Sequence, residues 1–556
     1  MNPLKPLKPV AAVPPAVSWS PSRRGLLATA LTLSAAAGAG GALCLALPGQ
    51  SRAAVGRRAL YHLTPRSGWA CDAQRPYYLG GELHLPHLQA QEVAGPGGWR
   101  LATSTDEVAF TDRGDIIPLE GDFPAWSGSA VVDVDNTAGF GAGAVVALVT
   151  RLPGNDMTHQ AQYLHWSTDE GRSFSRLEEP VIPNTDALSA TTSEEIDNAR
   201  WFRDPKIVRD EQRGRWVCVI GRACYLSFYV STDLRHWQWV SNFDYLTPES
   251  GNGFLGGMEC PDLFEMTADD GTSAWVLAAS MDGWEHGGLG TYAYWVGSWD
   301  GERFVTDNLV PQWLDHGFDW YAAVTWPSAD EPRTVRHAIG WLNNWKYAAR
   351  HVPTMDTDSY NGQYSIVREV RMRHEPGGWY CLVSMPISAL RHRLPRELEY
   401  EDLVLDDSMA VLPWSGQAYD LELDIDWDSA TNAGVCVARS ADGRRHTNIG
   451  VCDGEVYVDR GPSERPAVPF APYTRAHAPI DPQSRHVYLR ILVDRGSVEV
   501  FVNGGHTVMS NQLYLEEGDT GLALYADGGT ATFSSMTLRT AWPLRAVHTN
   551  TNGDVS

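Results

Sequence analysis

The segment STDEGRSF, residues 167–174, decides the expected fold, because closely similar segments occur three more times. They are STDEVAF from Ser104, STDLRHW from Ser231 and SWDGERF from Ser298, so successive copies are 63, 64 and 67 residues apart. Short apolar or aromatic runs flank each copy, as at a hairpin turn where a Ser or Asp side chain binds the local backbone. A supersecondary unit repeated at a long, even period is typical of radially arranged blades.

About five such units would fill residues 60–385. Helical periodicity is scarce there, and short β-branched and aromatic runs alternate with Gly, Asp, Asn and Pro. We therefore expect an all-β protein with a five-bladed β-propeller at residues 55–388. Four unrelated hairpins in a sandwich are the alternative, although sandwiches do not usually repeat a turn segment at so even an interval.

A charged segment with little alternation, residues 389–410, predicts a linker after the propeller. Strand-like segments resume beyond it, including YDLELDIDW from Tyr419 and VYLRILVDRG from Val487. Their period of two is typical of sheets that bury one face. The sequence therefore predicts a β-sandwich at residues 411–545 and a flexible tail at residues 546–556.

The first 54 residues have the order of an export signal. Basic residues precede an apolar run rich in Ala and Gly, and the small-residue segment SRAAVG follows it. Arg23 and Arg24 at the head of the run resemble a twin-arginine signal, which predicts a secreted, extracellular protein. A signal anchor is the alternative, because the run could just span a bilayer. We expect the signal to be cleaved off, and we expect the remaining protein to have no contact with the membrane.

Charge and cysteine usage exclude several kinds of partner. Removing the five basic residues of the signal would move the net charge from −24 to −29, which disfavours nucleic acid as a partner. Seven cysteines follow the signal without metal-ligand spacing, and we expect mostly buried free thiols. We expect no metal and no organic cofactor. The oligomeric state is left open, with a homodimer as one alternative.

Three segments of the repeat region place a carboxylate among residues that would change its chemistry. They are WACDAQRP with Asp72, WFRDPKI with Arg203 and Asp204, and GGMECPDLF with Glu259. Taken singly, such segments are more typical of turns and structural ion pairs. In a propeller the innermost strands converge on one cavity, where neighbouring charges drive carboxyl pKa values apart. Cleavage of a glycosidic bond needs this difference, since one carboxylate attacks and one acid protonates the leaving oxygen.

The combination resembles the fructan-acting enzymes of glycoside hydrolase family 32. Further matching segments begin at Trp126, Asp319, Gly340 and Val493, so the resemblance covers about residues 59–542. It implies a five-bladed propeller followed by a β-sandwich, with a fructan as the substrate. Carried over residue by residue, it implies that Asp72 is the nucleophile, Asp204 stabilises the transition state and Glu259 is the general acid/base. The implied substrate contacts are Trp69, Trp126, Ser127, Arg203, Trp320, Asn344 and Trp345.

The first acidic segment departs from the hydrolases of the family. Cys71 stands where they carry Asn, Ala73 where they carry Pro, and Leu88 where they carry a substrate-binding Gln. The chain is more similar here to the family's levan fructotransferases, although Ala73 departs from those too. This resemblance implies that levan, a β-2,6-fructan, is cleaved from its non-reducing end through a covalent fructosyl-enzyme. The two-fructose unit would then close to difructose dianhydride IV.

Two other functions stay open. One is an exo-levanase or a levanbiose-releasing hydrolase, which the product would distinguish from a fructotransferase. The other is a non-catalytic fructan-binding propeller. The presence of all three carboxylates disfavours it, because a dead site would be free to lose any of them.

Overall fold

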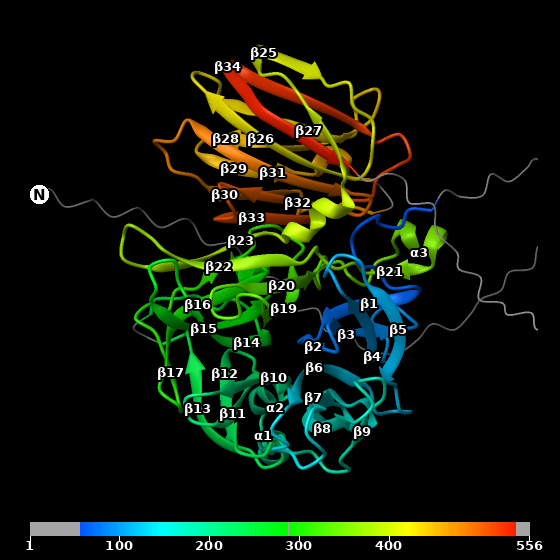
Figure 1. The fold of residues 1–556 in the computed structure, drawn as a ribbon, viewed down its shortest axis with the longest axis vertical. Helices are drawn as coiled ribbons and strands as arrows, with labels where there is room; N and C mark the ends of the chain where they lie inside the picture. Colours follow the sequence, from blue (N-terminus) through cyan, green and yellow to red (C-terminus); the bar gives the residue numbers. More distant parts are fainter. Residues whose placement is uncertain (1–55, 248–249, 287, 466–467, 541–556) are drawn as a thin grey trace, which may run out of the picture. The chain divides into compact units, whose positions relative to one another are not determined.

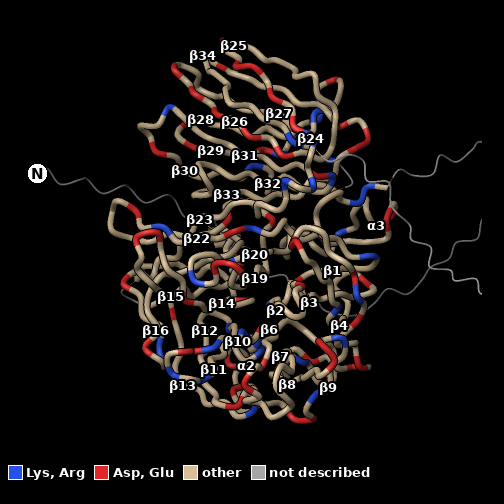
Figure 2. The backbone as a smooth tube through the Cα atoms, in the orientation of Figure 1, with Lys and Arg blue, Asp and Glu red and all other residues tan. Residues whose placement is uncertain are grey.

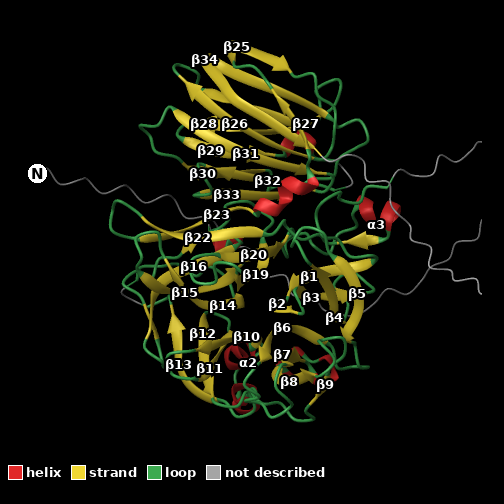
Figure 3. Ribbon diagram, viewed as in Figure 1, coloured by secondary structure: helices red, strands yellow, loops and turns green. Residues whose placement is uncertain are grey.

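The computed structural model describes residues 56–540, apart from residues 248–249, 287 and 466–467. Strands dominate these residues and the helices are short (Figure 3). The expected fold class is confirmed, because a five-bladed propeller is followed by a β-sandwich. The predicted signal and the predicted tail lie outside the described residues. No helix within the described part of the chain combines the length and the apolar character needed to cross a membrane.

Five antiparallel sheets form the blades, and their innermost strands face a common centre (Figure 1). From the innermost strand outward, blade one consists of β1 (Gly68–Ala73), β3 (Glu82–Ala90), β4 (Gly97–Ser104) and β5 (Thr111–Ile117), and blade two of β6 (Ala125–Asp133), β7 (Ala144–Arg151), β8 (Ala161–Ser167) and β9 (Ser175–Arg176). Blade three consists of β10 (Arg203–Asp210), β11 (Arg215–Gly221), β12 (Tyr225–Ser231) and β13 (Gln238–Asp244), and blade four of β14 (Met258–Thr267), β15 (Ser273–Met281), β16 (Tyr292–Trp299) and β17 (Phe304–Val305). Blade five consists of β19 (Tyr321–Pro327), β20 (Arg336–Trp341), β22 (Arg368–His374) and β23 (Tyr380–Pro386).

Short additional elements complete this ring. Strand β2 (Tyr77–Leu79) pairs with β3, and β18 (Gln312–Trp313) pairs with β16. Strand β21 (Tyr360–Asn361) comes from the connection inside the fifth blade but pairs in parallel with β1 of the first blade. The first and last blades are therefore held together by backbone hydrogen bonds as well as by packing. The helices are α1 (Thr185–Ser189), α2 (Ser193–Ala199) and α3 (Pro353–Asp358).

The repeated STD segment is the turn between the third and fourth strands of blades one to four. In each copy the Asp side chain accepts hydrogen bonds from backbone N–H groups two to four residues ahead: Asp106 accepts from Val108 and Ala109, and Asp169 accepts from Arg172 and Ser173. Asp233 and Asp300 bind the backbone of their turns in the same way. The prediction that these segments are hairpin turns is confirmed. The fifth blade has a different turn at this position, between β22 and β23.

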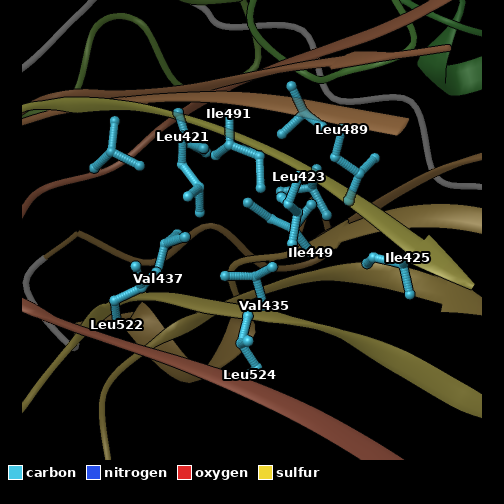
Figure 4. Packing of buried hydrophobic residues seen from close by; sticks show 14 of the residues in the cluster. Leu421, Leu423, Ile425, Val435, Val437, Ile449, Leu489, Ile491, Leu522 and Leu524 are labelled. Atoms are coloured by element: carbon cyan, nitrogen blue, oxygen red, sulfur yellow. The ribbon is translucent and has the colours of Figure 1, made fainter. Parts of the chain in front are cut away.

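Eleven strands form the sandwich, and its core lies between two layers. They are β24 (Arg396–Glu399), β25 (Leu403–Val411), β26 (Tyr419–Trp427), β27 (Asn432–Arg439), β28 (Thr447–Cys452), β29 (Glu455–Asp459), β30 (Arg475–Pro479), β31 (His486–Asp494), β32 (Ser497–Val502), β33 (Thr507–Gln512) and β34 (Gly521–Thr540). The long β34 pairs first with β27 and then with β26, so it joins both layers. Figure 4 shows Leu421 and Leu423 of β26 facing Val435 and Val437 of β27.

The prediction that residues 389–410 form a linker is wrong for most of this segment. Strands β24 and β25 within it pair with β34, so the sandwich begins at Arg396 and not at residue 411. Most side chains of β25 are exposed, Val404 and Met409 included. An edge strand with few buried positions carries no alternating pattern, which is why the sequence did not reveal it.

Buried charges join the propeller to the sandwich, while other acidic and basic residues are interspersed over both parts (Figure 2). Arg368 of β22 is fully buried and lies 2.9 Å from Asp315 and 2.5 Å from Glu499 of β32. Arg460, which follows β29, lies 2.7 Å from Asp319 of the propeller. Removing one partner of such a pair leaves an uncompensated buried charge, so the pairs specify one docking geometry.

His62 belongs to the same interface. Its Nδ1 is 2.9 Å from Asp494 and its Nε2 is 2.9 Å from Glu499, so each ring nitrogen faces a carboxylate oxygen. Burial lowers the pKa of His62, but hydrogen bonds to Asp494 and Glu499 and their charges outweigh it and raise this pKa to about 9. His62 is therefore an imidazolium at neutral pH.

The cysteines agree with the expectation from the sequence. All seven described cysteines are free, and five of them are buried. Two of the buried thiols, Cys71 and Cys260, lie on the innermost strands β1 and β14.

We expect His62→Gln to remove part of the pH dependence of stability. Because the folded-state pKa of about 9 lies above the ordinary 6.5, the stabilisation by His62 is complete below pH 6.5 and is lost as the pH rises through 9. The stabilisation by the charged form of His62 amounts to about 3 kcal/mol. Denaturant unfolding of wild type and variant between pH 6 and pH 9.5 measures it.

A matched control is His87→Gln, because burial lowers the pKa of His87 to about 4 and this histidine does not titrate in that range. If wild type and His62→Gln lost stability in parallel from pH 6.5 to 9, the imidazolium assignment would be wrong.

Candidate active site

Every innermost strand of the propeller carries a β-bulge at its cavity end. The register shifts lie between Ala70 and Ala73, Ala125 and Gly128, Arg203 and Lys206, Glu259 and Asp262, and Tyr321 and Val324. Left-handed backbone occurs within three of the shifts, with φ of 62° at Asp204, 44° at Cys260 and 48° at Ala322. A bulge bends its strand and changes the direction of its side chains. Here it directs residues of separate blades into one cavity.

This cavity has a volume of about 580 Å³ and is the candidate active site. All three predicted catalytic carboxylates line it, Asp72 from β1, Asp204 from β10 and Glu259 from β14. Five of the seven predicted substrate contacts line it as well: Trp69, Trp126, Ser127, Arg203 and Trp345. Cys71 and Leu88, two of the three departures from the hydrolase pattern, are also in its wall.

Asp72 is half-buried, and its carboxyl group is held on one side only. Its Oδ2 accepts a hydrogen bond of 2.6 Å from the Ser127 hydroxyl and lies 3.8 Å from Cys260 Sγ. Its Oδ1 accepts no hydrogen bond from the described residues. Burial raises the pKa of Asp72 to about 7, the Asp204 charge adds to the rise, and the Ser127 hydrogen bond opposes it. The carboxyl group therefore changes charge near neutral pH.

Asp204 is fixed by the neighbouring blades. Its backbone N–H donates to Thr150 Oγ1 at 2.9 Å, and its Oδ2 accepts from the Cys260 backbone N–H at 2.9 Å. Burial raises the pKa of Asp204 to about 6 although the Arg203 charge opposes the rise. Because the Cys260 thiol contacts both Asp72 and Asp204, at 3.8 Å and 3.7 Å, the two carboxylates occupy one small region.

Glu259 is held by a cation and a phenol. Its Oε1 accepts hydrogen bonds from Arg203 at 3.0 and 2.9 Å, and its Oε2 accepts one of 2.6 Å from the Tyr321 hydroxyl. The Arg203 guanidinium in turn lies 3.7 Å from the centroid of the Trp201 ring. Gly257 permits this stacking, because a Cβ atom there would lie 2.2 Å from the Trp201 ring.

The aromatic wall is formed by a tryptophan cluster. Trp69 packs at 6.0 Å from both Trp341 and Trp345, measured between ring centroids. Trp69 and Trp341 are buried, whereas Trp345 is 42% exposed. An exposed tryptophan face at the rim of a cavity suits contact with the apolar face of a sugar ring.

Two predicted substrate contacts, Trp320 and Asn344, lie outside the lining of the cavity. Trp320 does not line the cavity, since it is fully buried in the core between blades four and five and its Nε1 donates to Ser365 Oγ. Asn344 is also buried, and its side-chain amide donates to the Phe318 carbonyl and to Asp319. Both residues support the fold next to the site.

The sequence did not identify several residues that contact the carboxylates or line the cavity. Cys260 and Tyr321 lie at bulges and contact the carboxylates directly. Lys346 and Asp282 form an ion pair of 3.1 Å in the wall. Tyr321 stands inside a segment that matched the family, but nothing in the sequence shows which of its residues the bulge turns inward. The described His, Cys, Asp and Glu groups close enough to share a metal ion, Glu375, Cys381 and His506, lie outside this cavity.

Sequence comparisons agree with this geometry. Two protein-family models match, the N-terminal domain of the glycosyl hydrolases of family 32 at residues 62–382 and the C-terminal domain of the same family at residues 393–540. The chain is 41% identical over 491 residues to a levanbiose-producing levanase of Bacillus subtilis (strain 168), covering 87% of this chain and 90% of that one. It is 40% identical to a levanbiose-producing levanase of Geobacillus stearothermophilus, over 74% of this chain and all of the relative.

A comparison with solved structures supports the fold. The crystal structure of an exo-inulinase from Aspergillus awamori superimposes with a TM-score of 0.76 at 26% identity, covering 88% of this chain and 99% of the other. The two levanbiose-producing levanases thus share more sequence with the chain than the exo-inulinase does.

We expect Asp72→Asn to stabilise the protein at alkaline pH. Because the folded-state pKa of Asp72 is raised from 3.8 to about 7, ionising the buried carboxyl group destabilises the fold as the pH rises from 4 to 7. The variant removes this penalty, so its unfolding free energy should exceed that of wild type by roughly 2–4 kcal/mol at pH 8 and by little at pH 4. Denaturant unfolding at the two pH values measures the difference.

Asp262→Asn is the matched control, because Asp262 also lies on an innermost strand, β14, but is fully buried and is paired with Lys206 at 2.7 Å. This variant should lose stability. A loss of stability in Asp72→Asn at pH 8 would contradict the assignment of a raised pKa.

Proposed function

The chain belongs to glycosyl hydrolase family 32, and we propose that it is a levanase that releases levanbiose, a two-fructose unit, from the non-reducing end of levan. The observation that carries the proposal is the convergence of Asp72, Asp204 and Glu259 on one cavity in a chain 41% identical to a levanbiose-producing levanase. These relatives favour the hydrolase over the cyclising fructotransferase expected from the departures at Cys71 and Leu88.

In the first step Asp72 attacks C2 of the second fructose unit from the chain end. Its Oδ1 accepts no hydrogen bond from the described residues, while Ser127 holds Oδ2. The ionised carboxylate is the nucleophile, so a pKa of about 7 places the active form in the upper pH range of the free enzyme. Glu259, oriented by Arg203 and Tyr321, donates a proton to the oxygen that leaves with the rest of the polymer.

In the second step water replaces the enzyme at C2. The carboxylate of Glu259 accepts a proton from the water, which attacks C2, and the bond to Asp72 breaks. Two displacements at one carbon retain its configuration. Asp204 is held by the Cys260 N–H and stabilises the transition state through sugar hydroxyl groups and the developing positive charge.

The size and lining of the cavity suit a two-sugar product. Its volume of about 580 Å³ lies within the range of ligand sites and exceeds what one fructose ring fills. Asp204 is buried and Asp72 and Glu259 are partly buried, whereas Trp345 lies at the rim with 42% of its surface exposed. One fructosyl unit would bind beyond the attacked ring, and the polymer would leave along the rim.

A cyclising fructotransferase is the second candidate, and the apolar lining at Leu88 and Cys71 favours it. After the first step the 6-hydroxyl of the terminal fructose could attack C2 in place of water, with Glu259 accepting the proton, to give difructose dianhydride IV. A well-oriented internal nucleophile acts as if present at about 10⁵ M or more, well above the concentration of water. Apolar walls that exclude water shift the outcome further toward cyclisation.

A levan-degrading role fits a secreted protein, because the polymer is too large to enter a cell intact. We propose export, by the twin-arginine route that the N-terminal sequence resembles. The acidic mature chain would remain free of nucleic acid.

We expect incubation with levan to release levanbiose as the main early product, and Asp72→Asn to lower the rate at least ~10³-fold, because the retaining route needs the nucleophile. Chromatography that separates levanbiose, fructose and difructose dianhydride IV measures the product. Inulin is the matched control substrate, since it has β-2,1 linkages, and we expect slower release from it.

If the main product were a non-reducing cyclic disaccharide, the protein would be a cyclising fructotransferase and not a hydrolase. Activity of Asp72→Asn within tenfold of wild type would show that Asp72 is not the nucleophile. It would contradict both the hydrolase and the fructotransferase proposals.

A further inference from the structure

Three side chains of types that bind metals meet where β23 faces a turn of the sandwich (Figure 1). Glu375 lies in the turn between β22 and β23, Cys381 lies on β23, and His506 lies in the turn between β32 and β33. One ligand atom of each lies within 4.8 Å of the other two. None of the three lines the catalytic cavity.

The backbone brings the two turns unusually close. Ser384 of β23 donates its N–H to the Gly505 carbonyl at 3.0 Å. Gly505 has φ of +87°, and a Cβ atom there would lie 2.2 Å from the Ser384 carbonyl oxygen. Only glycine allows this approach. It places His506, the next residue, beside Glu375 and Cys381.

The hydrogen bonds of His506 determine which of its nitrogens is free to bind a cation. Nδ1 lies 2.8 Å from the Asn503 carbonyl oxygen, which can only accept, so Nδ1 carries the hydrogen. In the neutral ring Nε2 then holds a lone pair, yet it lies 3.2 Å from Glu375 Oε1, another acceptor. A metal cation between Nε2 and Oε1 would satisfy the lone pairs of both atoms. Histidines that bind metals typically donate the other ring N–H to a carbonyl in this way.

We propose that Glu375, Cys381 and His506 form a binding site for one Zn²⁺-class divalent cation, with water as the fourth ligand. Tetrahedral Zn²⁺ with bonds of ~2.0–2.3 Å holds its ligand atoms about 3.3–3.8 Å apart. Glu375 Oε1 is 3.2 Å from both Cys381 Sγ and His506 Nε2, which is close to that spacing. Thiolate and imidazole ligands select zinc-like ions over Mg²⁺ and Ca²⁺.

Binding would link the two parts of the protein. Glu375 and Cys381 belong to the last blade, whereas His506 belongs to the sandwich. His506 is exposed, so the ion can enter from solvent, and the Cys381 thiol releases its proton to solvent as the metal binds. Glu375 and Cys381 lie six residues apart, whereas His506 lies 131 residues beyond Glu375, so the sequence shows no complete set of ligands at metal-binding spacing.

The test uses the full-length protein after treatment with a chelator. We expect titration calorimetry with Zn²⁺ to give one site per chain, and Co²⁺ to give a thiolate-to-metal absorption band. Cys381→Ser should abolish the band, and His506→Gln should weaken Zn²⁺ binding on the order of 100-fold. The matched controls are Cys452→Ser, a more exposed thiol, and His477→Gln, a histidine 3.0 Å from Glu455 with no cysteine in the pair. Both controls should bind as wild type does.

Failure of wild type to bind Zn²⁺ or to give the Co²⁺ band would overturn the proposal and would leave the contact between His506 and Glu375 as a hydrogen bond without a metal ion. Equal binding by Cys381→Ser and wild type would overturn it as well. Circular dichroism of each variant shows whether it is folded. Because the wild-type band alone can refute the site, a misfolded variant does not weaken the test.

Discussion

The interaction between Arg203 and Glu259 is the one on which the active-site geometry depends. Without the guanidinium, three carboxyl groups would share a buried cavity with too little positive charge, and mutual repulsion would favour protonating them all. Arg203 binds Glu259 through two N–H groups and is itself held against Trp201. The pKa values of Asp72 and Asp204 are raised to about 7 and about 6. The two neighbouring carboxyl groups therefore lose their protons at different pH values.

The backbone supports this arrangement by the same device in each blade. A bulge at the inner end of each central strand turns selected side chains toward the cavity, and outer strands and inter-blade cores hold the bulges in place. The sandwich contributes from outside through buried ion pairs such as Arg460 with Asp319. Asp319 also accepts a hydrogen bond from Asn344, next to Trp345 at the rim. Docking of the sandwich thus supports the segment that carries the aromatic wall.

The sequence predicted the elements whose chemistry is local. The STD turns could be recognised because each Asp binds N–H groups two to four residues away, and the three carboxylates stand in short distinctive segments. Trp320 and Trp345 could not be told apart, because a large aromatic residue near a matching motif can face either the core or the cavity. The sequence did not predict strand β25, because an edge strand with mostly exposed side chains shows no alternation of apolar and polar residues. Cys260 and Tyr321 depend on the bulges, which pairing partners far away in the chain determine.

The same residues also leave hydrolysis and cyclisation open, since both pass through one covalent intermediate and differ only in which hydroxyl attacks it. The most direct test of the account is therefore to capture that intermediate. Rapid acid quenching of wild-type protein during levan turnover, followed by peptide mass spectrometry, should show two fructosyl units added to the peptide that contains Asp72. An adduct on Asp204 or Glu259, or no adduct on any carboxylate during turnover, would contradict it.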